Sequence, residues 1–99
     1  MSQKTSVSEK TRLLQKSPKL YKVIMHNDDY TTMEFVIDVL VNIFRKTPVE
    51  ATKIMYDVHK NGIGIAGVFP YDIAATKIQQ ATNAAIKNGF PFKLSMEEE

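Results

Sequence analysis

Residues 20–38 read LYKVIMHNDDYTTMEFVID, and this stretch joins a predicted strand to a predicted helix through a polar turn. The alternation of bulky and β-branched residues in LYKVIMHN predicts a strand that ends near Asn27. Thr31 and Glu34 have the Thr-x-x-Glu spacing of a capping box, which predicts a helix over about residues 32–45. Polar residues recur only about every fourth position of that helix. We therefore expect most of its surface to be covered and the helix to lie at the centre of the core.

The signals after this stretch complete a small fold of mixed type. Thr47 as N-cap, Pro48 in the first turn and Gly62 just past the end predict a second helix. A strand, a third helix and a last short strand are then expected at residues 62–70, 71–88 and 90–96. The order β-α-α-β-α-β favours a single compact α+β domain, with three helices covering one face of a three-stranded antiparallel sheet.

The composition is that of one ordinary globular domain, with 99 residues of which 43% are hydrophobic and 24% charged. No apolar run approaches the roughly 20 residues that a membrane span needs, and the absence of cysteine fits a cytoplasmic protein. Residues 1–19 carry five basic residues against Glu9 alone. We expect them to form a flexible extension, in which TRLLQK is a candidate docking element. Residues 20–99 carry a net charge of −2, which argues against a nucleic-acid surface on the folded domain.

Asn27, Asp28 and Asp29 give the turn more polar groups than the start of one helix needs. A Ca²⁺ or Mg²⁺ site is disfavoured because the Asp-x-Asp-x-Asp-Gly loop is missing. Zinc lacks ligands, since there is no cysteine and His26 and His59 are far apart in the sequence. No phosphate loop, nucleophile elbow or His-Glu-x-x-His helix is present, so we expect neither an enzyme nor a cofactor. Capping and the recognition of a cation remain as alternatives.

A hydrophobic pocket beside the acidic turn is predicted from the spacing of apolar residues on the first two helices. His59 shares a helix face with Met55, and Val58 lies beside it. Met33 and Val36 likewise share a face at the start of the first helix. Taken alone, a histidine at this position would more often serve the dipole at the end of its helix. If the two helices pack together, the pocket would fit a ligand with an ammonium group next to a large apolar group.

The strings NDDYTTMEFV, MYDVHKNG, GIAGVF and AATK resemble the ClpS family, the adaptors of the ATP-dependent Clp protease, over about residues 20–98. The resemblance implies a monomeric, non-enzymatic adaptor that recognises bacterial N-end rule substrates by an N-terminal Leu, Phe, Tyr or Trp. It also implies delivery of these substrates to the N-terminal domain of a Clp AAA+ unfoldase such as ClpA, with residues 1–19 taking part. A protein-interaction or ribosome-associated domain that does not depend on a free amine is the alternative.

The resemblance assigns roles to individual side chains of this chain. The residues matching the amine-binding set of the family are Asn27, Asp28 and His59, with Asp29 as a supporting turn residue. Those matching its side-chain pocket are Thr31, Met33, Val36, Met55, Val58 and Phe92. Those matching its unfoldase contact are Asp72 and Lys77. The chain departs from the common family pattern at Asp72, where Glu is usual, and at Phe92, where Leu is usual.

Overall fold

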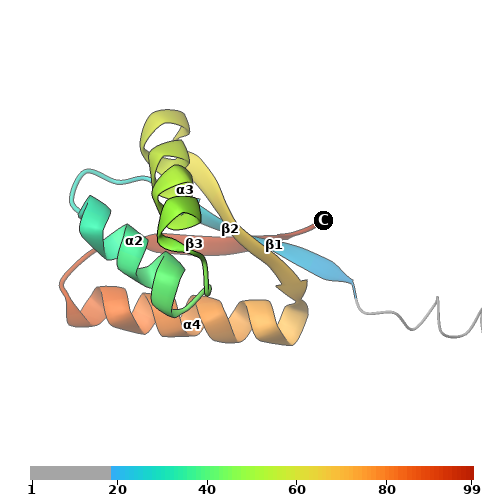
Figure 1. Cartoon of the computed structure of the whole chain (residues 1–99). Coiled ribbons are helices and arrows are strands. Elements are labelled where there is room, and N and C mark those ends of the chain that lie inside the picture. Colours follow the sequence, from blue (N-terminus) through green and yellow to red (C-terminus); the bar gives the residue numbers. More distant parts are fainter. Residues whose placement is uncertain (1–18) are drawn as a thin grey trace, which may run out of the picture.

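Three antiparallel strands form the sheet of this domain, and three helices lie on one of its faces (Figure 1). The computed structural model describes residues 19–99, so the expected extension falls outside the described residues except for Lys19. The elements are β1 (Leu20–His26), α2 (Met33–Asn42), α3 (Pro48–Asn61), β2 (Ile63–Pro70), α4 (Tyr71–Lys87) and β3 (Lys93–Glu98). The strand order is β2-β1-β3, which confirms the predicted α+β class and element order. Among residues 19–99, no helix has both the length and the apolar character that crossing a membrane would require.

Helix α3 forms where local signals predict it. The Thr47 hydroxyl accepts a hydrogen bond from Glu50 N at 3.1 Å, and Glu50 Oε1 accepts one from Thr47 N at 3.0 Å. This reciprocal capping box satisfies backbone donors that a helix start leaves free. Gly62 ends the helix at φ 87°, a left-handed conformation that favours glycine. The boundaries of α3 are thereby fixed within the segment itself.

Helix α2 is shorter than predicted. It ends at Asn42 rather than near residue 45, because the chain turns at Arg45, which has φ 59°. The turn directs the Phe44 ring into the core, where it is 4% exposed. Two contacts support the chain at this early end, since Lys46 N donates to Leu40 O and Lys77 Nζ donates to Ile43 O. The second of these comes from α4, far away in the sequence, so the end of α2 depends on tertiary structure.

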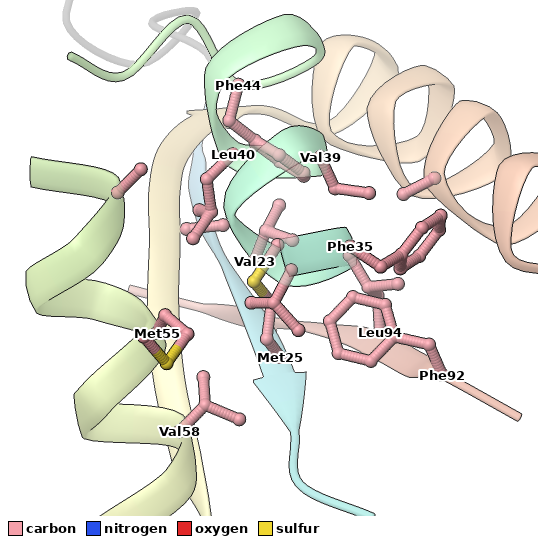
Figure 2. Close-up of a cluster of buried hydrophobic side chains, with 14 of the residues drawn as sticks. Val23, Met25, Phe35, Val39, Leu40, Phe44, Met55, Val58, Phe92 and Leu94 are labelled. Carbon is pink, nitrogen blue, oxygen red and sulfur yellow. The ribbon is translucent and has the colours of Figure 1, made fainter. Parts of the chain in front are cut away.

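The core lies between the sheet and the helices (Figure 2). Val23 and Met25 of β1 are fully buried in it, and Met55 and Val58 of α3 pack over them. The close approach of β2 to α3 depends on Gly64, where an added Cβ atom would lie 2.7 Å from Val58 Cγ2. This contact holds the C-terminal half of α3 against the sheet.

Strand β3 begins later than predicted, at Lys93 rather than at residue 90. The preceding residues instead form the connection from α4. In that connection the Phe90 and Phe92 rings both pack on Phe35 of α2, with ring centroids 5.0 and 6.1 Å from it. The aromatic residues that made this segment resemble a strand therefore serve the core, not the sheet pairing.

Candidate functional site

The turn between β1 and α2 is organised by the Asp28 carboxylate. Asp28 Oδ1 accepts hydrogen bonds from Tyr30 N at 2.8 Å and Thr31 N at 2.7 Å. Asp28 Oδ2 accepts one from Thr31 Oγ1 at 2.7 Å. Partial burial would raise the pKa of Asp28, but the hydrogen bonds from Thr31 and Tyr30 outweigh it and hold the pKa below its ordinary value. Asp28 is therefore ionised, and its three hydrogen bonds fix the path of the chain into α2.

The helix cap is one residue later than predicted. Thr32, not Thr31, is the N-cap of α2, and its hydroxyl accepts a hydrogen bond from Phe35 N at 3.1 Å. The Thr31 hydroxyl is already engaged by Asp28, which explains why the neighbouring threonine takes the cap. With Thr32 as N-cap, the third helical residue is Phe35 rather than Glu34, so the expected capping box of Thr31 and Glu34 is not formed.

The two aspartates divide their tasks differently from the expectation. The hydrogen bonds of the turn are made by Asp28, whereas Asp29 was expected to be the supporting turn residue. Within residues 19–99, no hydrogen bond or ion pair of the exposed Asp29 side chain is found. Within this part of the chain, both carboxylate oxygens of Asp29 are therefore without a partner, whereas three hydrogen bonds take up most of the acceptor sites of Asp28.

An open cavity of about 440 Å³ lies where this turn meets the start of α2 and the end of α3. Its lining consists of Asn27, Asp28, Asp29, Tyr30, Thr31, Thr32, Met33, Glu34, Val36, Met55, Val58 and His59. This set contains all the predicted amine-binding residues and every predicted side-chain pocket residue except Phe92. Tyr30, Thr32 and Glu34 line it without having been predicted; their position between predicted residues was the only signal available.

The base of the cavity is apolar and belongs to the core. Val36, Met55 and Val58 are each at most 5% exposed, so they offer a fixed hydrophobic surface. Met33 is 42% exposed and Tyr30 is 75% exposed, which leaves two large side chains free to contact a ligand. Such a surface can bury one bulky apolar group.

The polar residues of the cavity come from two segments that the backbone ties together. Asn27 N donates to Gly62 O at 2.9 Å, which joins the end of β1 to the end of α3. His59 lies in the last turn of α3, three residues before this junction, and its side chain is exposed. The junction thereby brings the His59 imidazole to the same cavity as the polar turn.

The charge of the cavity is negative. Asp28, Asp29 and Glu34 contribute carboxylates, and among the described residues no lysine or arginine lines it. Asn27 and His59 add a carbonyl oxygen and a ring nitrogen that can accept hydrogen bonds. Acceptors without a basic partner suit a ligand that brings its own positive charge and donors. Among residues 19–99, no group of three or more His, Asp or Glu side chains is arranged to hold a metal ion.

Three predicted site residues lie away from this cavity. Phe92 is 5% exposed and packs edge-on against Phe35 in the core, and within residues 19–99 it is not part of the cavity lining. Asp72 and Lys77 lie on α4, where Asp72 is exposed in the first turn. The Lys77 ammonium donates to Ile43 O at 2.7 Å and lies over the Phe69 ring at 5.4 Å, so it is engaged within the domain.

The sequence and the fold are similar to those of characterised proteins. The family described as "ATP-dependent Clp protease adaptor protein ClpS" matches residues 16–95. ATP-dependent Clp protease adapter proteins ClpS from Clostridium acetobutylicum and Acetivibrio thermocellus are 63% and 50% identical to the chain, covering 99% and 100% of it. The alignments cover the same shares of those two proteins. The structure of Agrobacterium tumefaciens ClpS2 bound to L-phenylalaninamide superposes with a TM-score of 0.80 at 41% identity, over 83% of this chain and 99% of that one.

Proposed function

Because this chain belongs to the ClpS family of adaptor proteins of the ATP-dependent Clp protease, we propose that it selects substrates by their N-terminal residue. The ligand in this proposal is the free α-amino group of a protein together with a bulky first side chain, Leu, Phe, Tyr or Trp. The bound substrate then passes to a Clp AAA+ unfoldase. The observation that carries the proposal is the cavity in which a buried apolar base is bordered by acceptors and carboxylates.

The two parts of the cavity match the two parts of this ligand. An α-ammonium group has three donors, and its reference pKa near 7.7–8.0 leaves it mostly protonated at neutral pH. Charge-assisted hydrogen bonds of this kind contribute about 1.5–3 kcal/mol each. Burial of a Leu or Phe side chain on Val36, Met55 and Val58 adds about 1.5–3 kcal/mol. An internal Leu or Phe lacks the amine and would lose the first contribution.

A similar protein supports this assignment through the ligand in its structure. The Agrobacterium tumefaciens ClpS2 was solved with L-phenylalaninamide, which carries a free amine, a benzyl side chain and an amide in place of the next peptide bond. It has the chemistry of an N-terminal phenylalanine. At 41% identity, the similarity between the two chains supports the same type of ligand for the present one.

Within the cavity, we assign the acceptors of the ammonium group to Asn27, Asp29 and His59. Asp28 supplies negative charge nearby, but its oxygens already accept three hydrogen bonds in the turn. Asp29 is the neighbouring carboxylate, its oxygens have no partner among residues 19–99, and it lines the same cavity. The role of Asp28 in binding is then mainly to hold the turn in which Asn27 and Asp29 stand.

Fluorescence anisotropy with labelled peptides tests the proposal. A Phe-initiated peptide should bind, whereas its N-acetylated form and a Val-initiated form should bind at least about 10-fold more weakly. Asp29→Asn should weaken binding of the Phe-initiated peptide about 10- to 150-fold, which corresponds to one charge-assisted hydrogen bond. Asp38→Asn, an exposed carboxylate of α2 outside this cavity, is the matched control and should bind normally. Equal affinity for all three peptides would instead favour an interaction domain that ignores the free amine.

For delivery, we propose that the face of α4 around Asp72 contacts the N-terminal domain of a ClpA-like unfoldase. Asp72 is exposed, whereas the Lys77 ammonium is engaged by Ile43 O. Asp72→Lys should therefore abolish binding to that domain in calorimetry and leave peptide binding unchanged. Asp38→Lys is the charge-matched control. Unfoldase binding that is unaffected by Asp72→Lys would remove α4 from the interface.

A further inference from the structure

The face of the sheet opposite the helices carries a row of apolar side chains. Ile24 of β1 lies opposite Ile65 of β2, and the neighbouring pairs His26–Ile63 and Lys22–Val68 bring Ile63 and Val68 to the same face, together with His26 and Lys22. Ile63, Ile65 and Val68 are 48%, 41% and 38% exposed. Ile24 is buried but does not belong to the core cluster between the sheet and the helices, as expected from its alternation with Val23 and Met25. We call Ile24, Ile63, Ile65 and Val68 the open-face cluster.

The C-terminal glutamates lie at the corner of the sheet where the N-terminal segment joins the domain. Strand β1 begins at Leu20 beside the end of β3, where Leu20 O accepts a hydrogen bond from Glu99 N at 2.9 Å. Lys19 Nζ lies 3.7 Å from Glu98 Oε1. Three successive glutamates, residues 97–99, therefore stand where residues 1–18 enter, and Figure 1 shows the start of β1 and the C-terminus at the same side.

We propose that residues 10–16 of this chain, KTRLLQK, fold back and dock on the open-face cluster. These residues lie outside the part that the structure describes, and the chain joins that part at Lys19. The segment places two adjacent leucines among three basic residues, and it is followed by Ser-Pro, which favours a turn. The leucines match the apolar cluster, and the basic residues match Glu97, which the strand register places on this face opposite Lys22.

The length of the connection permits this docking. Five residues lie between Leu14 and Leu20, and the six steps of an extended chain span at most about 20 Å. Along β1, Ile24 lies roughly 13 Å from Leu20 at the usual rise of a strand. A chain that reverses at Pro18 brings Leu14 and Leu13 back over β1 to roughly 7–10 Å past Leu20, beside Lys22 and Val68 and next to Ile24. Because the segment is tethered, its high effective concentration favours docking even where the contact itself is small.

The docked segment and the proposed amine site are independent. The cavity is lined by the turn after β1 and by α2 and α3, and it shares no residue with the open-face cluster. The proposal therefore holds or fails without reference to peptide binding, and its test uses the full chain with no peptide present.

Paramagnetic broadening of methyl signals tests the docking. The chain has no cysteine, so Ser8→Cys gives a unique attachment site for a nitroxide, on the N-terminal side of residues 10–16. Methyl groups of Ile24, Ile65 and Val68 should broaden more strongly than that of Val39, which lies in the core on the other side of the sheet. Equal broadening of these four residues would overturn the proposal.

Substitutions within the N-terminal segment provide the second part of the test. Leu13→Ser combined with Leu14→Ser should abolish the selective broadening, whereas Val7→Ser, an apolar-to-polar change outside the segment, should preserve it. Persistence of the broadening in the double variant would overturn the assignment to these leucines. A mixture of isotope-labelled chain without a nitroxide and nitroxide-bearing chain without isotope label detects contact between copies. Broadening that arises only there would make a second copy the occupant and likewise refute the proposal.

Discussion

Replacing Gly64 with alanine should force β2 away from α3 at the point where α3 supports the cavity. The new Cβ atom would lie 2.7 Å from Val58 Cγ2 and 3.1 Å from Ile54 O. The first atom belongs to a valine, which has one strongly preferred rotamer in a helix, and the second belongs to the helix backbone. Neither can move without a shift of α3 itself.

The expected cost follows from these contacts. Overpacking of this kind destabilises by about 1–3 kcal/mol. The loss of conformational freedom in the unfolded chain offsets about 0.4–1 kcal/mol, because alanine replaces glycine. A net loss of about 1–2 kcal/mol corresponds to a fall in Tm of roughly 5–15 °C for a domain of this size. Since Val58 lines the cavity, affinity for a Phe-initiated peptide should fall as well.

Gly67→Ala is the matched control in the same strand. There the added Cβ atom would meet Phe69 ring atoms at 2.6 and 2.7 Å, and this half-buried ring can rotate away. Thermal unfolding followed by circular dichroism and peptide anisotropy should place Gly64→Ala well below both the parent and Gly67→Ala. A Gly64→Ala variant as stable as the parent would refute the reasoning, as would a destabilised variant with unchanged peptide affinity.

Three further changes test other parts of the domain. The pKa of Asp28 is lowered in the folded state, so the ionised carboxylate contributes fully to the free energy of unfolding above the ordinary pKa of 3.8. This contribution is lost as pH falls through the folded-state pKa. The difference in the free energy of unfolding between the parent and Asp28→Asn, measured by urea denaturation, should therefore disappear in that acidic range and persist at neutral pH. Lys77→Met should lower the free energy of unfolding by about 1–2 kcal/mol in the same assay, because it removes the donor to Ile43 O and the cation over two aromatic rings. Lys77→Arg keeps the charge and should recover part of this loss. Equal losses in the two variants would contradict the role of the charge. Thr47→Ala should destabilise by about 1 kcal/mol through loss of the cap of α3, and hydrogen exchange should rise first in the first turn of that helix rather than in α4.

The sequence was sufficient for elements whose boundaries depend on local signals. In α3, the N-cap threonine, the proline after it and the glycine at the end lie within one segment, and the structure uses each as predicted. The end of α2 could not be predicted in this way. No glycine marks it, and it depends on burial of the Phe44 ring and on a lysine from α4, both of which are tertiary contacts.

The candidate site was predictable as a set of residues but not in its internal division of roles. Asp28 and Asp29 are chemically identical, and only the backbone path decides which of them reaches the amides of the turn. The two adjacent threonines present the same ambiguity, and Thr32 takes the cap because Asp28 engages Thr31. Phe92 was assigned to the pocket by resemblance alone, whereas its ring packs on Phe35.

The central place of β1 in the sheet bears on how the chain folds. The first strand pairs with both of the others, and His26 contacts Ser95, a partner 69 positions later in the sequence. Contacts of such long range close large loops before they bring stabilisation, which slows folding. Helix α3, with its complete set of local signals, can form early. The backbone N–H and C=O groups on both edges of β1, however, stay unpaired until β2 and β3 are in place. Folding rate should therefore respond most to substitutions that affect strand pairing, and α3 cap variants should act mainly on the stability of an element already formed.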